Sequence, residues 1–233
     1  MLVKTNSFSY FCCMASFIYN PKVYKNWFFS RIVCLSRWAV NFRDSFVDKR
    51  ICGVSLNKYT ESVRKGSTGS QSTPYIVLQE IFKDVKFQPS DSFIDVGCGR
   101  GRVLAYMVRK NFPGKISGIE LNEEVACFAR DWAKKYDNVN VISGDAFNLD
   151  YNSFSIIYMG RPFEPELFHR FIGHLETTLS HPVSLYYWVE QESGNYLDGR
   201  KGWKRLVRKR LFWRKGYFIA NSPQRYSVWI FTP

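Results

Sequence analysis

Short apolar runs alternate with helical repeats along the chain from Asp91 onwards. The runs typical of strands cover residues 92–96, 115–120, 140–143, 155–159 and 183–189. Between them, apolar residues recur at three- and four-residue spacing over 102–110, 122–136 and 167–179, which indicates helices that bury one face. Strands that alternate with helices predict βαβ units and a parallel sheet.

Further strands are predicted near the C-terminus, at 211–220 and 225–231. The predicted fold class is therefore α/β, with a doubly wound, mostly parallel seven-stranded sheet and an N-terminal helical extension. Up to Lys65 the chain mixes aromatic and basic residues without strand alternation, so we expect short helices and loops there. Residues 66–74 (GSTGSQSTP) are small and hydroxylated, which is typical of a flexible connection or an ordered lid. A short amphipathic helix at 75–82 then leads into the core. We therefore divide the chain into an extension and lid, 1–74, and a core, 75–233.

Composition favours one packed domain in a reducing compartment. At 233 residues the chain is too short for two full-sized domains, and 45% of its residues are apolar. Its cysteines form no Cys-x-x-Cys pair and its histidines no zinc-ligand cluster; His169 and His174 are expected to be structural, and His181 to start a loop. We expect free thiols, a cytoplasmic protein and no metal.

The net charge of +13 is concentrated at the two ends of the chain. Residues 1–70 carry net charge +8, residues 71–155 carry −1, and residues 156–233 carry +6. Within Arg200–Lys215, nine basic residues and no acidic one surround Trp203, Leu206 and Val207 at helical spacing. This predicts an amphipathic element that either docks on the sheet with solvated charges or recruits an anionic partner or membrane surface.

The N-terminal run Ser7–Tyr19 is uncharged and aromatic. It is too short to span a bilayer, and no small-x-small cleavage site follows it. We expect it to pack on the core, with peripheral membrane contact as the alternative.

The stretch 93–104, FIDVGCGRGRVL, carries the chemistry. An apolar strand runs into Asp95, and Gly97, Gly99 and Gly101 alternate before a helix begins. Glycines permit unusual backbone angles, and a helix N-terminus offers free N–H groups to a carboxylate. A dinucleotide fingerprint would want a further glycine where the chain has Arg102. The order Asp-x-Gly-x-Gly-x-Gly instead resembles the first motif of class I S-adenosylmethionine (SAM)-dependent methyltransferases.

Two later acids fit the same resemblance. Glu120 ends the second strand, where a carboxylate can accept both ribose hydroxyls of the cofactor. Asp145 follows the third strand, where the resemblance places the contact to the adenine amino group. The resemblance covers about residues 72–190 and implies SAM as cofactor. The cofactor-binding residues it implies are Asp95, Gly97, Cys98, Gly99, Gly101, Glu120, Leu121, Asp145 and Ala146, with Thr73 and Tyr75 as lid contacts.

The fourth strand ends in the loop Gly160-Arg161-Pro162-Phe163. Methyltransferases that act on nitrogen often carry Asn or Asp, Pro, Pro and an aromatic residue here, and this chain keeps one proline and the aromatic. We expect Pro162 and Phe163 to form a wall of the acceptor pocket, and Glu164 to act as general base for a hydroxyl acceptor. Arg161 is expected either to grip an anionic group of the acceptor or to be an exposed loop arginine.

Two functions are compatible with these residues. The first is an active methyltransferase acting on a protein side chain, a glycan component or a small molecule. The second is a catalytically inactive SAM-fold module that binds nucleic acid or another anionic partner. The glycine loop and the two acids favour the enzyme, whereas the altered fourth-strand motif and the basic flanks favour the module.

Overall fold

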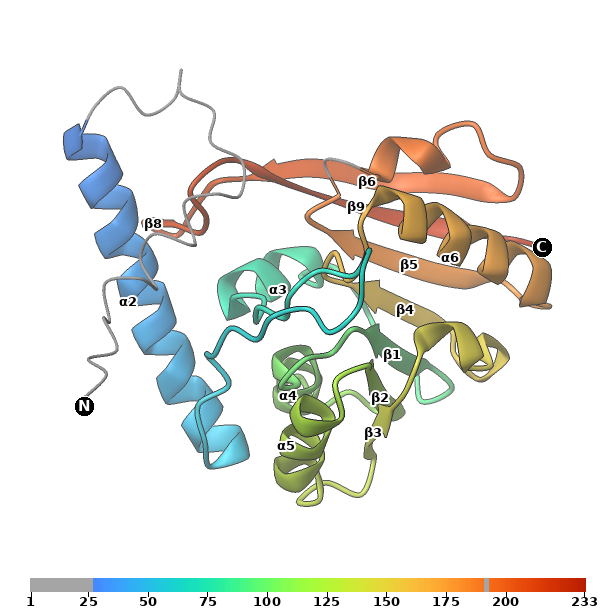
Figure 1. Ribbon diagram of the computed structural model, residues 1–233, viewed down its shortest axis with the longest axis horizontal. Coiled ribbons are helices and arrows are strands. Elements are labelled where there is room, and N and C mark those ends of the chain that lie inside the picture. The colour runs from blue at the N-terminus through green and yellow to red at the C-terminus, as the bar shows by residue number, and fades with distance from the viewer. Residues whose placement is uncertain (1–26, 191–192) are drawn as a thin grey trace, which may run out of the picture.

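The protein is built around a seven-stranded sheet with helices on both faces (Figure 1). The structure, a computed structural model, describes residues 27–190 and 193–233. The strand order is β3-β2-β1-β4-β5-β9-β6. Neighbouring strands are parallel from β3 through β5, whereas β9 runs antiparallel to both β5 and β6. The predicted doubly wound, mostly parallel seven-stranded sheet is confirmed.

The central βαβ units match the sequence prediction to within a few residues. The strands are β1 (Ser92–Val96), β2 (Lys115–Glu120), β3 (Val139–Ser143), β4 (Ile156–Met159) and β5 (Val183–Trp188). The helices between them are α4 (Arg102–Arg109), α5 (Glu123–Ala133) and α6 (Pro165–Thr178), with short 3₁₀ turns at Ala146–Asn148, Tyr151–Ser153 and Gly194–Leu197. The side chain of Asn122 accepts a hydrogen bond from Val125 N, so Asn122 caps α5 as predicted.

The sheet separates two apolar layers. One layer lies under α2, α3, α4 and α5, and the other lies under α6. Alternate residues of each strand enter opposite layers: Phe93 packs in the first and Ile94 in the second, and both are fully buried. The carboxyl ends of β1, β2, β3 and β4 therefore meet at one edge, between the two layers.

The C-terminal region differs from the prediction. The predicted strand 211–220 is wrong: the chain forms β6 (Trp203–Leu211), a small hairpin of β7 (Trp213–Arg214) and β8 (Tyr217–Phe218), and then β9 (Gln224–Phe231). The helical spacing predicted within Arg200–Lys215 is also wrong, because this segment contains the edge strand β6 and then β7. A bulge between Arg205 and Val207 shifts the strand register, so the apolar residues do not follow strict alternation.

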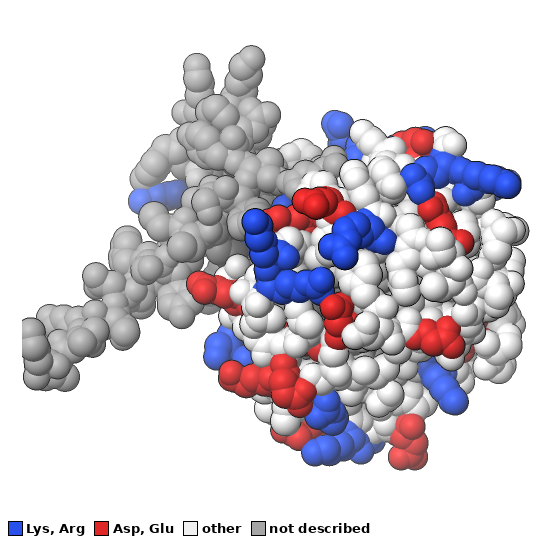
Figure 2. All heavy atoms as spheres, turned by 45° about the vertical axis from the view of Figure 1, so that its right-hand side comes forward, with Lys and Arg blue, Asp and Glu red and all other residues white. Residues whose placement is uncertain are grey.

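Several charges of this edge are paired within the chain. Arg200 pairs with Glu176, Arg208 with the buried Glu190, and Arg214 with Glu80. On the face seen in Figure 2, basic and acidic groups are interspersed. The anionic partner expected for Arg200–Lys215 stays a prediction. Fewer lysines and arginines are available to bind it than the sequence indicates, because some of them pair with acids of the chain.

Of the N-terminal extension the structure describes residues 27–74, where one long helix, α2 (Trp27–Cys52), replaces the short helices expected, and residues 53–65 form loops as expected. Helix α2 runs along one side of the molecule, against the β7–β8 hairpin and α4 (Figure 1). Helix α3 (Tyr75–Ile81) begins where the core was predicted to begin, although the division of the chain at residue 74 itself stays a prediction. The run Ser7–Tyr19 lies outside the described residues. No helix among residues 27–190 and 193–233 is both long and apolar enough to cross a bilayer.

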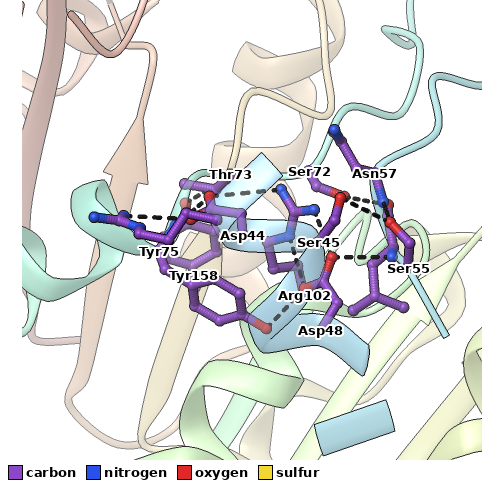
Figure 3. A network of polar contacts seen from close by, with 12 residues as sticks. Asp44, Ser45, Asp48, Ser55, Asn57, Ser72, Thr73, Tyr75, Arg102 and Tyr158 are labelled. Atoms are coloured by element: carbon purple, nitrogen blue, oxygen red, sulfur yellow. Dashed lines mark hydrogen bonds and ion pairs between the residues drawn. The ribbon is translucent and has the colours of Figure 1, made fainter. Parts of the chain in front are cut away.

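A buried ionic network fastens α2 to the core (Figure 3). The Nε and Nη2 atoms of Arg102 lie 3.1 and 2.7 Å from the two carboxylate oxygens of Asp48. Asp48 also accepts a hydrogen bond from the hydroxyl of Tyr75, and Asp44 accepts one from the Tyr75 amide. These four side chains are almost completely buried. The glycine loop, which ends at Arg102, is thereby tied to a helix 54 residues earlier in the chain.

Candidate active site

A cavity opens at the carboxyl edge of the sheet. Its floor is formed by the ends of β1, β2 and β4 and by the turn after β3, and its roof by residues 60–73, which we call the cover. Most of the cofactor-binding residues predicted from sequence line it: Asp95, Gly97, Cys98, Glu120, Leu121, Asp145, Ala146 and Thr73. Residues from five separate segments are thus brought together as the sequence predicts.

The glycine loop adopts backbone angles that suit glycine. Gly97, Gly99 and Gly101 have φ of 74°, 55° and 86°. At each one the chain itself occupies the space that a Cβ would need. A Cβ on Gly97 would lie 2.7 Å from Pro162, one on Gly99 2.1 Å from Ser70 Oγ, and one on Gly101 2.7 Å from Trp132. The glycines therefore let the fourth-strand loop, the cover and α5 approach the loop closely. Gly99 and Gly101 do not line the cavity, so the prediction that they contact the cofactor gains no support from the geometry.

Glu120 has the geometry expected of a ribose-binding acid. Its Oε2 accepts the amide of Gly99 at 2.9 Å, and its Oε1 accepts the amide of Asn122 at 2.9 Å. Each carboxylate oxygen has a further lone pair, so both can still accept a hydroxyl. The two backbone bonds fix the rotamer of Glu120 and point its carboxylate along the cavity floor.

A second carboxylate lies close to the first. Asp95 is the penultimate residue of β1 and is almost fully buried. Burial, and then the charge of Glu120, raise the pKa of Asp95 well above its ordinary value. The thiol of Cys98 has a raised pKa for similar reasons, burial first and the Asp95 charge second. The two carboxylates make the cavity floor acidic, so the floor favours a cationic ligand.

Asp145 pairs with the cover. Its Oδ2 lies 2.5 Å from Nη1 of Arg64, and its Oδ1 accepts the amide of Phe147, so it caps the turn after β3. The Arg64 guanidinium also lies 5.7 Å from the centre of the Phe147 ring. Arg64 was missed in the sequence because nothing local to it indicates a partner 81 residues away.

Backbone contacts seat the cover on the fourth-strand loop. Thr68 N donates to the Pro162 carbonyl at 3.0 Å, and Glu164 N donates to the Gly66 carbonyl at 2.8 Å. The Thr68 hydroxyl donates to the Arg161 carbonyl. Of the two alternatives for the small-residue segment 66–74, these bonds favour an ordered lid.

The fourth-strand loop only partly matches its predicted role. Arg161 and Pro162 are partly exposed and line the cavity, and Arg161 has a left-handed φ of 55°. Phe163 also lines it, but is 7% exposed and packs against Phe147 and Phe171, so it is as much a core residue as a pocket wall. Glu164 does not line the cavity; it is exposed and precedes α6. The geometry gives no support to Glu164 as a general base.

The two predicted lid contacts, Thr73 and Tyr75, lie in different surroundings. Thr73 lines the cavity and lies 3.0 Å from the hydroxyl of Tyr158, a buried residue of β4 whose pKa is raised mainly by burial. Tyr75 is turned away: it is 1% exposed and its hydroxyl donates to Asp48 (Figure 3). The geometry gives no support to Tyr75 as a cofactor contact, because its partners lie in α2. Tyr158 was not predicted, because in the sequence it looks like an ordinary buried aromatic residue of a strand.

The three histidines lie outside the cavity. His169 stacks on Tyr196 with ring centres 3.7 Å apart, and His174 packs beside Tyr151. Both ring nitrogens of His181 contact backbone carbonyls. Among the described residues, no three His, Cys, Asp or Glu side chains gather as they would around a metal ion.

Comparison with known proteins agrees with this site. Residues 93–179 match the family described as "Methyltransferase domain". A curated relative from Clostridium acetobutylicum, "Ribosomal RNA small subunit methyltransferase A", is 31% identical over 98 residues, which is 42% of this chain and 35% of that protein. A "Probable ribosomal RNA small subunit methyltransferase A" from Methanosarcina acetivorans is 27% identical over 110 residues, 46% of this chain and 39% of that protein. The matched part of the chain thus spans well under half the length of these relatives.

Among solved structures, the fold is similar to that of a methyltransferase from Pyrococcus furiosus. The TM-score is 0.56 at 17% identity, covering 83% of this chain and 97% of that one. The sheet order, the glycine loop followed by two strand-end acids, and the family match over residues 93–179 agree with one another. The chain thus has the fold of class I SAM-dependent methyltransferases, and its residues 93–179 match a methyltransferase domain.

Proposed function

We propose that the chain binds SAM in the sheet-edge cavity and transfers its methyl group to an acceptor that enters beside Arg161. The observation that carries this proposal is the convergence of Asp95, Glu120 and Asp145 on one cavity. Each lies near the end of a different parallel strand or just after it, as in a nucleoside-binding site of this fold.

The charge of the cavity fits the charge of the ligand. SAM carries a sulfonium and an ammonium group, and it supplies an electrophilic methyl group when bound. The buried carboxylate of Asp95 lies beside Glu120, and each would be stabilised by a nearby cation. Glu120 would accept the ribose hydroxyls. Asp145 would accept a hydrogen bond from the adenine amino group at Oδ2, the same oxygen that pairs with the Arg64 guanidinium.

The chain's own residues have positioning tasks in this reaction. The cover closes the cavity from the solvent side, which excludes water from the reacting centre. Pro162 and Phe163 wall the acceptor side, and Arg161 offers a guanidinium there for a carboxylate or phosphate of the acceptor. Methyl transfer is an in-line displacement, so holding the nucleophile on the line of the breaking bond is the main contribution of this loop.

The acceptor classes favoured by the sequence are a protein side chain, a glycan component or a small molecule. Ribosomal RNA is a second candidate, since two curated relatives carry that name over the segment they share with this chain. Gly160 weighs against amino groups of bases, because it has no side-chain carbonyl to accept them. The inactive binding module has no observation of its own among the described residues.

The test is transfer of radiolabel from SAM into cell extracts treated with nuclease, protease or neither. Label that disappears with protease supports a protein acceptor, and label that disappears with nuclease supports RNA. Label of low molecular mass that resists both supports a small molecule, and resistant label of high molecular mass supports a glycan. The Glu120→Gln variant controls for transfer by other enzymes. Failure of the wild-type protein to bind SAM in calorimetry at millimolar ligand would overturn the proposal.

A further inference from the structure

The outer face of α2 carries a stripe of exposed apolar side chains, which we call the α2 stripe: Leu35, Trp38, Phe42 and Phe46. These side chains are 67%, 64%, 67% and 61% exposed, and the Trp38 and Phe42 rings stack with centres 5.7 Å apart. At 3.6 residues per turn they fall within an arc of about 80°. The arc lies opposite Val33, Val40 and Asp44, which face the core. A contiguous stripe of this kind marks an interaction surface.

The helix cannot bury this stripe by rotating. Its inner face is fixed by the Asp48–Arg102 ion pair and by the bond from Tyr75 N to Asp44. The β7–β8 hairpin holds it as well: Phe218 N donates to Ser36 Oγ, and the Phe218 ring packs on Phe29. Helix α2 lies along one side of the molecule (Figure 1). The exposed α2 stripe is therefore held on the face opposite the buried residues of the helix.

The exposed charges that α2 itself carries beside the α2 stripe are all of one sign. The only carboxylates in α2 are Asp44 and Asp48, and both are fully buried on the inner face. Arg31 is exposed one turn before the stripe, and Lys49 and Arg50 are exposed just after it. The outward face thus combines aromatic and aliphatic groups with cations and lacks anions.

We propose that the α2 stripe docks the protein on an anionic lipid bilayer, with α2 lying in the plane of the interface. Helices that bind there present Trp, Phe and Leu to the acyl boundary and Lys and Arg to the headgroups. Tryptophan in particular favours the depth at which its ring is apolar and its N–H is hydrated. The proposal rests on α2 alone and does not depend on methyl transfer.

A second copy of the chain fits this face less well. Four side chains at these exposures offer roughly 500 Å², whereas a stable interface buries about 800 Å² on each partner. Pairing two stripes symmetrically would also bring the basic ends of two helices together. A bilayer supplies both an unlimited apolar surface and the opposite charge.

The experiment compares sedimentation of the full chain with phosphatidylcholine vesicles that contain or lack phosphatidylglycerol. The wild-type protein should bind the anionic vesicles. The triple variant Trp38→Gln, Phe42→Gln, Phe46→Gln should lose at least about tenfold in partition coefficient while keeping the same thermal unfolding midpoint. The matched single variants are Phe42→Gln on the stripe and Leu206→Gln, which removes a 51% exposed apolar side chain elsewhere. Only the first should weaken binding.

A second arm tests charge. The variant Arg31→Gln, Lys49→Gln should bind anionic vesicles more weakly and with a shallower salt dependence. Three results would overturn the proposal. The first is no binding by the wild-type chain, and the second is equal binding by the triple variant. The third is a loss in the triple variant only of self-association or of RNA binding, which would assign the stripe to a second copy or to nucleic acid.

Discussion

The carboxylate of Asp48 holds both Nε and Nη2 of Arg102, at 3.1 and 2.7 Å, in a site where neither side chain reaches solvent. Arg102 is the first residue of α4 and directly follows the glycine loop. The N-terminal helix therefore fixes the end of the loop on which the proposed SAM site depends.

Replacing Asp48 by Ala should destabilise the fold strongly. The substitution leaves the Arg102 guanidinium buried without its partner, which costs about 3–5 kcal/mol in the free energy of unfolding. Urea denaturation measures this loss. Asp131→Ala is the control: it breaks the exposed pair with Lys134 and should change stability by no more than about 0.5 kcal/mol. A loss below 1 kcal/mol for Asp48→Ala would mean that water or Asp44 takes over the pairing.

Replacing Asp95 by Asn should stabilise the ligand-free protein and weaken SAM binding. Because folding raises the pKa of Asp95, its contribution favours the folded state at low pH and is lost as pH rises through the raised pKa. Asn carries no charge that must be buried at high pH. We therefore expect the free energy of unfolding to increase by about 1–2 kcal/mol at pH 8, and this increase should shrink as pH falls. Urea denaturation across pH measures the gain, and calorimetry measures the loss of affinity. A variant less stable than the wild type at pH 8 would contradict this account.

Replacing Glu120 by Gln should raise the dissociation constant for SAM and S-adenosylhomocysteine. The amide keeps the shape of the side chain, but it removes the charge that binds the ribose, and its NH2 cannot accept one of the two backbone amides of Gly99 and Asn122. We expect a loss of about 1.5–3 kcal/mol, or roughly 10–100-fold. Isothermal titration calorimetry measures it. Glu123→Gln removes an exposed carboxylate three residues later and should bind as the wild type does. Equal affinities for all three proteins would place the ribose elsewhere.

Replacing Arg64 by Gln should loosen the cover. The Arg64–Asp145 pair is about one-third exposed on each side, so it contributes about 0.2–1 kcal/mol. We expect S-adenosylhomocysteine to dissociate up to about fivefold faster, measured by stopped-flow fluorescence, with faster chymotryptic cleavage at the exposed Tyr59. Lys65→Gln removes the neighbouring charge and serves as control. If both variants release ligand equally fast, net charge and not the ion pair holds the cover.

The central units could be predicted because β1, β2, β4 and β5 are buried on both faces and each helix is buried on one. Continuous apolar runs and the Asn122 cap leave a clear record in the sequence. The acids Asp95, Glu120 and Asp145 could be placed at one edge because parallel strands end together.

The ends of the chain could not be predicted for different physical reasons. Helix α2 is apolar on its outer face as well as on its inner face, so its sequence lacks the alternation of apolar and polar residues from which an amphipathic helix is predicted. Strand β6 is half-solvated and carries arginines whose partners, such as Glu190 and Asp198, come from elsewhere in the chain. The surroundings of Tyr75 were not predicted because its partner Asp48 is remote in sequence.

The bulge in β6 has a consequence for solubility. β6 is an edge of the sheet, and an edge strand offers unpaired N–H and C=O groups to any other strand. The irregularity between Arg205 and Val207 interrupts that row, and the exposed Lys204 and Lys209 repel an approaching copy of the same strand. A chain with 45% apolar residues thus carries at its sheet edge a built-in barrier to the edge-to-edge stacking that begins fibrils.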